Sequence, residues 1–345
     1  MANGIQTANG KAFEYSCVEA LRRALSGCGE IEIESSPQLD TAKSLYEAVD
    51  SEMKYALDKA ADAAVRVVKR LEPQLWNPNN NEPLYLSIQP DSAGIKGDVR
   101  DVVCLRKQNG WEIGFSCKHN HHAVKHSRLS DTIDFGKEWV GIPCSKEYFD
   151  SVVPLFSELR KLRDDSKSAG EPILWESIEN KAEKYYKPIL EAFMKELKRI
   201  ADENKGTPEG LIRYLLGRND FYKVITEDKS RTTRVEAINI TGTLNSSSGD
   251  EKPITKVPIL KMPTQFYHIG FKPDSDNTVE VVCDEGWQIS MRIHNASSRV
   301  EPSLKFDVQL ISFPSSVYAQ VEPWETEAER QAIRISAYAE KLIKK

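Results

Sequence analysis

The chain has 345 residues, of which 40% are hydrophobic and 29% are charged, and its formal net charge at pH 7 is −5. That length allows one large domain or two ordinary ones, and the net acidity excludes nucleic-acid binding through overall charge, though not through a local basic patch. No run of about 18 apolar residues occurs, the N-terminus lacks an apolar leader segment and no CxxC motif is present. We therefore expect a cytoplasmic protein with reduced thiols and no membrane segment.

The first half of the chain reads as a mixture of helices and strands. An apolar stripe at three- and four-residue steps predicts one helix over residues 42–72. Strands rich in valine and isoleucine are predicted at 84–88 and 99–118. Further along, the patterns predict a helix at 121–131, a short strand at 139–142, helices from 146 to about 204, and a loop within them at 163–172.

The pattern changes after residue 204. Between about 220 and 315 the chain reads as short strands separated by turn-rich spacers, and the last twenty residues read as a charged surface helix. The sequence therefore predicts an α/β region over 1–204 and a β-rich region over 205–345.

A hairpin is predicted within residues 97–118, GDVRDVVCLRKQNGWEIGFSCK, because Asn109-Gly110 is the preferred centre of a type I′ turn. If the turn forms, Gln108 pairs with Trp111 and Asp101 lies directly opposite Lys118. Opposite side chains have Cβ atoms about 4.5–5.5 Å apart. Strand alternation adds further polar residues to this face and assigns to the core the side chains of Cys104, Ile113 and Phe115.

An acid beside a lysine at a sheet surface suits metal-dependent phosphodiester hydrolysis. The Asp101 carboxylate would hold a hard divalent cation, and Lys118 would orient or deprotonate the attacking water and stabilise charge on the phosphate. The alternative is a cross-strand salt bridge on a solvated face. The segment 96–128 contains seven Lys or Arg residues and three acids, a local charge of +4 that favours a polyanionic substrate.

These residues resemble a known family. Asp101, an apolar strand, a turn and Ser116-Cys117-Lys118 resemble the active-site hairpin of the PD-(D/E)XK nucleases. The longer strings SCKHNHHAVKHSRLSDTIDFG (116–136) and RIHNASSRVEPSLKFD (292–307) resemble the HaeIII family of type II restriction endonucleases. Because the two strings lie in different halves, the resemblance spans most of the chain.

The resemblance implies a fold, an activity and partners. The fold would be a PD-(D/E)XK nuclease-like α/β core of a mixed sheet flanked by helices in residues 1–204, followed by a β-rich DNA-recognition region with a C-terminal helix in residues 205–345. The activity would be Mg²⁺-dependent cleavage of both strands of double-stranded DNA at a short palindrome such as GGCC. A cognate cytosine methyltransferase would be the functional partner, and a homodimer is compatible with a palindromic site.

One position departs from the family motif. Its second acid should stand two residues before the lysine, where this chain has Ser116. Another acid must then contribute, and we expect Glu52, which falls among apolar helix positions, ahead of Asp134, which could fold back after the lysine. The catalytic set is thus predicted as Asp101, Lys118 and Glu52, with metal ligands drawn from Asp101, Glu52, Cys117 and Asp134.

Four of the six histidines lie in residues 119–126, HNHHAVKH. Zinc needs three or four ligands at defined spacing, but only His122 and His126 form an i, i+4 pair, and the neighbouring cations would repel a dication. A polar helix start suits phosphate better, because its free backbone N–H groups favour anions. We therefore expect this segment to line the DNA backbone through His119, Asn120, His122, Lys125 and Arg128.

The second half should carry the residues that read bases, because arginine and lysine suit guanine in the major groove. One cluster is expected in a polar loop after the strand 287–291, and a second lies earlier; the candidates are Arg231, Arg234, Arg292, His294, Asn295 and Arg299. For any single one, contact with phosphate is the favoured role. Two other functions stay open: a zinc or HNH-type nuclease built on the histidines, and a non-catalytic DNA-binding module, suggested by Ser116.

Overall fold

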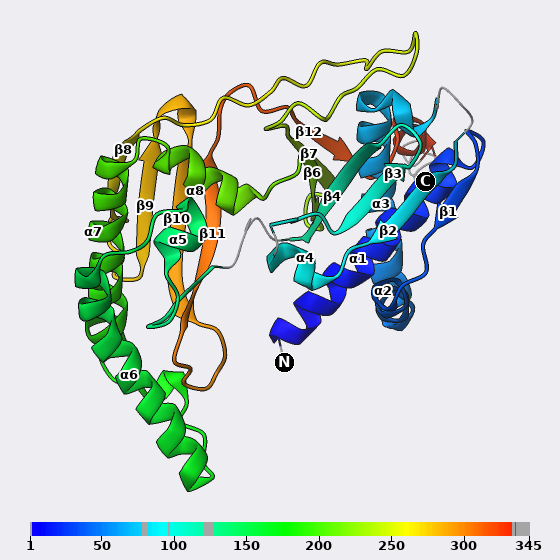
Figure 1. The fold of residues 1–345 in the computed structure, drawn as a ribbon. Helices are drawn as coiled ribbons and strands as arrows, with labels where there is room; N and C mark the ends of the chain where they lie inside the picture. Colours follow the sequence, from blue (N-terminus) through cyan, green and yellow to red (C-terminus); the bar gives the residue numbers. More distant parts are fainter. Residues whose placement is uncertain (1, 78–81, 96, 121–126, 333–334, 336–345) are drawn as a thin grey trace. The chain divides into compact units, whose positions relative to one another are not determined.

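The computed structural model describes residues 2–77, 82–95, 97–120, 127–332 and 335 (Figure 1). The chain divides into two compact units. Unit 1 combines residues 1–121, 219–260 and 316–345, and unit 2 combines residues 122–218 and 261–315. The division therefore does not follow the boundary expected at residue 204, because the middle helices and the later strands belong to one unit.

Unit 1 is built on a seven-stranded mixed sheet (Figure 1). In spatial order its strands are β1 (Ile31–Ile33), β2 (Leu84–Ile88), β3 (Val102–Arg106), β4 (Trp111–His119), β6 (Phe221–Glu227), β7 (Thr232–Ile238) and β12 (Ala319–Pro323). The pairs β1–β2 and β4–β6 are parallel, and the other pairs are antiparallel. Parallel neighbours need a long connection. The connection between β4 and β6 contains residues 122–218, the first segment of unit 2.

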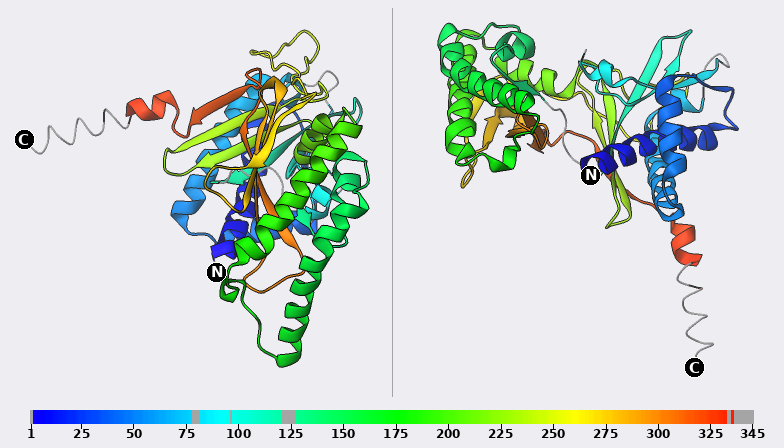
Figure 2. Two further views of the ribbon diagram at one scale, coloured as in Figure 1. Left: turned by 90° about the vertical axis from the view of Figure 1, so that its left-hand side faces the viewer. Right: turned by 90° about the horizontal axis from the view of Figure 1, so that it is seen from below.

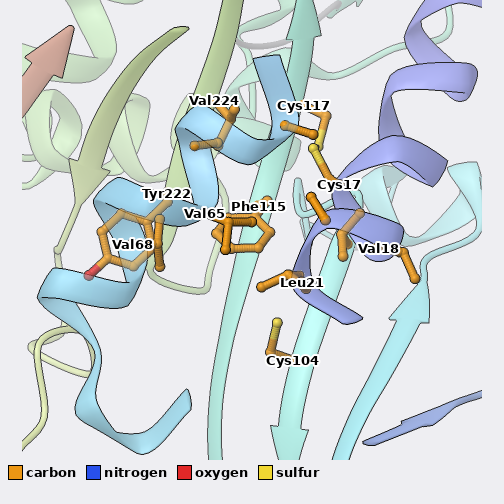
Figure 3. Close-up of a cluster of buried hydrophobic side chains, with 14 of the residues drawn as sticks. Cys17, Val18, Leu21, Val65, Val68, Cys104, Phe115, Cys117, Tyr222 and Val224 are labelled. Atoms are coloured by element: carbon orange, nitrogen blue, oxygen red, sulfur yellow. The ribbon is translucent and has the colours of Figure 1, made fainter. Parts of the chain in front are cut away.

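Two long helices supply the apolar cover of this sheet. Helix α1 (Ala2–Leu25) and helix α3 (Ser51–Leu71) contribute the buried side chains that meet the strands, as the cluster in Figure 3 shows. Three shorter elements complete the helical part of the unit: α2 (Pro37–Ala48), η1 (Pro73–Leu75) and α4 (Asp91–Ile95). Leu21 of α1, Val68 of α3 and Phe115 of β4 are buried together, so one core joins both helices to the sheet.

The helix expected over 42–72 is two helices. It breaks after Ala48, and Asp50 starts α3 by accepting a hydrogen bond from the backbone N–H of Met53 at 2.8 Å. An aspartate with extended backbone at this position satisfies one of the free N–H groups of the first turn. Glu52 is therefore a first-turn residue and does not lie in the middle of a helix.

Unit 2 contains a five-stranded antiparallel sheet. In spatial order its strands are β5 (Arg128–Leu129), β11 (Leu304–Ser312), β10 (Gln288–Asn295), β9 (Thr278–Cys283) and β8 (Phe266–Phe271). Its helical elements are α5 (Phe135–Val140), α6 (Lys146–Ala169), η2 (Trp175–Ser177), η3 (Ala182–Tyr186), α7 (Lys187–Glu203), α8 (Thr207–Leu216) and η4 (Asp284–Gly286). Helices α6 and α7 lie side by side over this sheet (Figure 2).

Aromatic side chains join the helices and the sheet of unit 2. Phe193 of α7 lies 4.8 Å from Phe135 of α5 and 5.3 Å from Phe306 of β11, measured between ring centroids. Trp139 contacts the same group, at 5.7 Å from Phe193. Tilted aromatic pairs at these distances stabilise a core beyond the area that they bury.

Several local expectations in unit 2 were wrong. The stretch 139–142, expected as a strand, is the end of α5, which stops at Gly141 because that residue adopts a left-handed backbone (φ 77°). Helix α6 continues through most of the expected loop at 163–172 and ends at Gly170. In the range 121–131, Arg128 and Leu129 form strand β5, while residues 121–126 lie outside the described residues.

Candidate active site

The predicted hairpin forms, but its register differs from the expected one. Arg106 pairs with Trp111 and Val102 with Phe115, so residues 107–110 form a four-residue turn in place of the two-residue turn on Asn109-Gly110. The pairing is shifted by two residues, and Asp101 does not lie directly opposite Lys118. An even shift keeps every side chain on its predicted face, which is why the face assignment was right.

Asp101 and Lys118 meet as predicted. The Lys118 Nζ lies 3.5 Å from Asp101 Oδ2, and each side chain is about a quarter exposed, at 25% and 24%. Asp101 immediately precedes β3, and its Oδ2 also accepts a hydrogen bond from the backbone N–H of Cys117 at 2.7 Å. The carboxylate is therefore fixed beside the lysine at the border between protein and solvent.

A second carboxylate joins this pair from helix α1. Glu14 is 5% exposed, and its Oε2 lies 3.2 Å from Lys11 Nζ. Burial, together with the negative charge of Asp101, raises the pKa of Glu14 to about 8, while the charges of Lys11 and Lys118 act against this rise. Two carboxylates that repel one another beside a lysine form a site that a divalent cation would stabilise.

Glu14 was missed in the sequence, although the signal was present. Cys17, Val18 and Leu21 follow it at three, four and seven residues and are all buried, so Glu14 lies on the apolar stripe of α1. The carboxylate on a buried helical stripe that was expected at Glu52 is therefore found at Glu14, in a region where the sequence pattern predicted no helix.

Glu52 does not lie where the stripe argument placed it. Its side chain is exposed in the first turn of α3, where an acidic group favours the positive end of the helix dipole. It lines a pocket of about 270 Å³ with Asp228 and Arg231. The premise of a buried carboxylate at Glu52 is wrong, and its metal-binding role has no support from this position.

Asp134 belongs to unit 2, whereas Asp101 and Lys118 belong to unit 1. It caps helix α5, and its Oδ1 accepts hydrogen bonds from the backbone N–H groups of Lys137 and Cys144, both at 2.9 Å. Although partial burial opposes the effect, these bonds lower the pKa of Asp134. The carboxylate thus has a local structural role that explains its presence without a metal.

The Cys117 side chain, expected among the metal ligands, is buried in the core of unit 1. Its Sγ is buried against Cys17 Sγ of α1, 3.7 Å away (Figure 3). This contact and burial raise the pKa of Cys117 well above its ordinary value, so its thiol belongs to the core. All six cysteines are free thiols.

A second lysine lies next to the pair on the same sheet. Lys223 of β6 is the partner of Ser116 in the β4–β6 ladder, and it is 4% exposed. Burial lowers the pKa of Lys223 to about 8, and the charge of Lys118 contributes in the same direction. A buried lysine therefore lies on the strand next to β4, close enough to Lys118 for the two charges to interact.

Two of the predicted DNA-lining residues are engaged within unit 1. His119 Nε2 lies 3.0 Å from Asp228 Oδ2, and Asn120 Nδ2 donates to the same oxygen at 2.8 Å. The His119 side chain is 8% exposed. His122 and Lys125 lie outside the described residues.

A model of the HaeIII restriction endonuclease family matches residues 10–314. The type II restriction enzyme HaeIII of Haemophilus aegyptius is 39% identical over 318 residues, which cover 92% of this chain and 98% of that enzyme. This chain belongs to the HaeIII restriction endonuclease family. It is a type II restriction endonuclease, a site-specific deoxyribonuclease, and the resemblance drawn from its motifs is confirmed. No solved structure matches it.

Membership of the HaeIII family weighs against one of the two open alternatives, because a non-catalytic module is not expected of a type II restriction enzyme. The zinc alternative stays untested, because residues 121–126, which contain three of the four clustered histidines, lie outside the described residues. No helix in the described part of the chain is long and apolar enough to cross a membrane.

The expected base-reading residues of this HaeIII-family chain divide between the two units. Arg231 and Arg234 belong to unit 1, where Arg231 pairs with Glu325 and Arg234 pairs with Glu236. Both guanidinium groups are already neutralised by a carboxylate. A DNA contact would require each to exchange or share that partner.

In unit 2, the expected polar loop is largely a strand. Strand β10 extends to Asn295, so Arg292 and His294 are strand residues. Arg292 is 57% exposed and lies 3.3 Å from Asp307, whereas the Asn295 amide is buried and donates to the backbone carbonyls of Ser297 and Arg299. Two further predicted DNA-contact residues of unit 2 are exposed: Arg299, expected to read bases, and Arg128, expected to line the DNA backbone.

Proposed function

We propose that this enzyme is a Mg²⁺-dependent endonuclease of the PD-(D/E)XK type whose catalytic group is Glu14, Asp101 and Lys118. The observation that supports this most is the 3.5 Å contact between Lys118 and Asp101 at the start of β3, an inner strand of the sheet, together with a buried Glu14 whose charge interacts with both residues. Glu14 takes the place that the motif leaves open at Ser116. Unit 1 would be the catalytic domain, and the β-rich sheet of unit 2 would contribute to DNA recognition.

The donor set fits magnesium. Mg²⁺ commonly binds through one or two carboxylates and keeps water or phosphate oxygens as its other ligands, and Glu14 with Asp101 offers this number. The strong rise in the pKa of Glu14 indicates repulsion and burial that a bound dication would offset. When bound, the ion would polarise the phosphate and lower the pKa of the attacking water.

The residues of the chain then have separate tasks. Asp101 and Glu14 supply negative charge at the site and hold the cation. Lys118 donates hydrogen bonds to a nonbridging oxygen of the scissile phosphate, or to the attacking water, and stabilises the charge that grows on phosphorus. The hydrogen bond from the Cys117 N–H fixes the Asp101 carboxylate in position beside Lys118.

The substrate is proposed from the relative. The relative HaeIII is a type II restriction enzyme. We propose that this enzyme likewise cuts double-stranded DNA at a short palindrome, and GGCC is the first sequence to test. A cognate cytosine methyltransferase would protect the host sites in the cytoplasm, where both enzymes meet the DNA. A homodimer would match the twofold symmetry of such a site.

One digest tests activity, site and metal together. Unmethylated DNA is incubated with purified enzyme and Mg²⁺, and the product ends are sequenced; the same digest is run after chelation and after Mg²⁺ is restored. We expect one recurrent sequence at the ends and full recovery with Mg²⁺ alone. Recovery that requires zinc, or one tightly held zinc per chain by metal analysis, would favour the histidine-based nuclease instead.

A further inference from the structure

The two residues that directly follow Lys118 are held by a closed set of hydrogen bonds. Asn120 donates its backbone N–H to the carbonyl of Thr226 at 3.0 Å, and its Oδ1 accepts from the backbone N–H of Asp228 at 3.0 Å. In the other direction, Asp228 Oδ2 lies 2.8 Å from Asn120 Nδ2 and 3.0 Å from His119 Nε2. These four bonds join the end of β4 to the turn between β6 and β7.

The backbone at this point needs such support. Asn120 has φ 52°, a left-handed conformation that asparagine tolerates but that still costs free energy outside glycine. It marks the residue where the chain leaves the sheet, directly after the β4–β6 ladder ends at the pair of His119 and Thr226. Strand ends without further contacts fray.

The chemistry of the network is specific to a carboxylate. The hydrogen bond from His119 lowers the pKa of Asp228, so Asp228 is ionised at neutral pH and can only accept. His119 must therefore carry its hydrogen on Nε2. A nearly buried imidazole needs a polar partner, and Asp228 provides it from a strand connection more than 100 residues away in sequence.

We propose that Asp228 is a positioning residue for the cleavage reaction, which acts by fixing the end of β4 and thereby the place of the Lys118 ammonium beside Asp101. This inference rests on the proposed catalytic role of Lys118. Loss of the clamp frees the peptide that carries Lys118, and its Nζ then samples positions away from the phosphate. A displacement of about 1 Å in a catalytic group can cost on the order of 100-fold in rate.

The experiment compares steady-state cleavage of a duplex that carries the recognition site by four variants. Asp228→Ala removes the clamp. Asn120→Gly adopts the left-handed backbone without strain and loses only the side-chain bonds to Asp228 and the 3.4 Å contact with His119 Nε2, so it guards against a variant that does not fold. Asp228→Asn keeps an oxygen that can accept from His119 and Asn120. Ser230→Ala, in the same turn, loses bonds only to Glu227 and Thr232 and serves as the control.

We expect Asp228→Ala and Asn120→Gly to lower kcat by roughly 10- to 100-fold with KM for DNA within about threefold, because the loss concerns placement of the lysine and not binding. Asp228→Asn should keep kcat within about fivefold of the wild type, and Ser230→Ala should have the kcat of the wild type. The inference is overturned if folded Asn120→Gly and Asp228→Ala keep wild-type kcat, or if their loss lies wholly in KM.

A parallel measurement on Lys118→Ala separates this inference from the proposed function. If Lys118→Ala cleaves like the wild type, the catalytic assignment itself fails. If Lys118→Ala is inactive while the clamp variants keep full kcat, only the role of Asp228 fails.

Discussion

Lys118 and Asp101 are the residues whose substitution tests the proposed site most directly. Their side chains are partly solvent-accessible and lie 3.5 Å apart, which a plain surface salt bridge would also satisfy. Such a bridge contributes about 0–1 kcal/mol to stability. Catalysis and stability therefore respond very differently to its removal.

Lys118→Ala and Asp101→Asn should each lower the cleavage rate by at least about 100-fold, because one removes charge stabilisation at the phosphate and the other removes a metal ligand. Single-turnover cleavage with excess enzyme measures this directly. Lys107→Ala is the matched control, since Lys107 lies in the turn of the same hairpin and forms an ion pair with Glu34, away from the site. Cleavage by both site variants within about tenfold of the wild type would leave the surface salt bridge as the better explanation.

Glu14→Gln should raise the Mg²⁺ concentration that gives half-maximal cleavage, because it removes one of two carboxylates available to the ion. Glu52→Gln and Asp134→Asn, the acids favoured by sequence, serve as controls and should leave this concentration unchanged. A titration of rate against Mg²⁺ gives the three values. An increase confined to Glu52→Gln or to Asp134→Asn would identify that acid, and not Glu14, as the second metal ligand.

The raised pKa of Glu14 also predicts a pH dependence of stability. Burial and the charge of Asp101 raise the pKa of the Glu14 carboxyl from 4.5 in the unfolded chain to about 8 in the folded protein. Between these values the folded state keeps a proton that the unfolded state releases, so the free energy of unfolding falls as pH rises from about 4.5 to about 8. Without metal, Tm of the wild type should fall over this window relative to Glu14→Gln.

Magnesium competes with that proton, so it should raise Tm of the wild type more at pH 8 than at pH 6 and should affect Glu14→Gln little. Thermal denaturation in chelator and in excess Mg²⁺ at both pH values provides the comparison. Parallel Tm curves for wild type and Glu14→Gln across the window would show that Glu14 titrates normally.

At the scale of elements, strand β4 has a glycine, Gly114, where the side chain of Arg100 crosses it. Arg100 is 7% exposed; its guanidinium binds Asp98 at 2.7 Å and Glu112 at 3.0 Å. A Cβ at Gly114 would lie within 2.8 Å of three side-chain carbons of Arg100. The glycine thus permits the side chain next to Asp101 to lie flat on the strand.

Gly114→Ala should destabilise the protein by about 1–3 kcal/mol, because overpacking forces Arg100 to move. Gly10→Ala in helix α1, where a Cβ meets nothing within 4 Å, should instead stabilise it by up to about 1 kcal/mol through helix propensity. Urea denaturation of the two variants and the wild type measures both changes. Equal midpoints for Gly114→Ala and the wild type would mean that the Arg100 side chain can move to another position at no cost in stability.

At the scale of the whole molecule, we propose that unit 2 supplies sequence recognition to the catalytic group proposed in unit 1. Arg292, an exposed strand residue of unit 2, begins the string 292–307 that resembles the HaeIII family. Its pairing with Asp307 can orient the guanidinium for a bidentate contact. Exposure alone does not distinguish a base contact from a phosphate contact.

Arg292→Ala should cost about 1–3 kcal/mol in binding and relax the preference at one base pair if Arg292 reads a guanine. Cleavage of a set of single-substitution sites, with binding measured against salt, gives both quantities. A uniform loss across all sequences, with a shallower salt dependence, would identify Arg292 as a phosphate anchor.

The sequence by itself determined what depends on neighbours along the chain. Strand β2, the helices from 146 to 203 and the faces of the β3–β4 hairpin follow from periodicity, and Asp101 and Lys118 share a face because strand alternation survives an even register shift. The family was predicted from two sequence segments, 116–136 and 292–307, which can be compared without a structure.

Only the tertiary structure decided which distant residues meet. The charges of Glu14 and Asp101 interact because α1 packs on the sheet. Asp228 contacts His119 because β4 and β6, far apart in sequence, are neighbours in a parallel ladder. The same packing leaves Glu52 exposed, because the chain breaks at Asp50 and starts a new helix there. Periodicity assigns a residue to one side of its own element, but which element covers that side depends on the packing of the whole core.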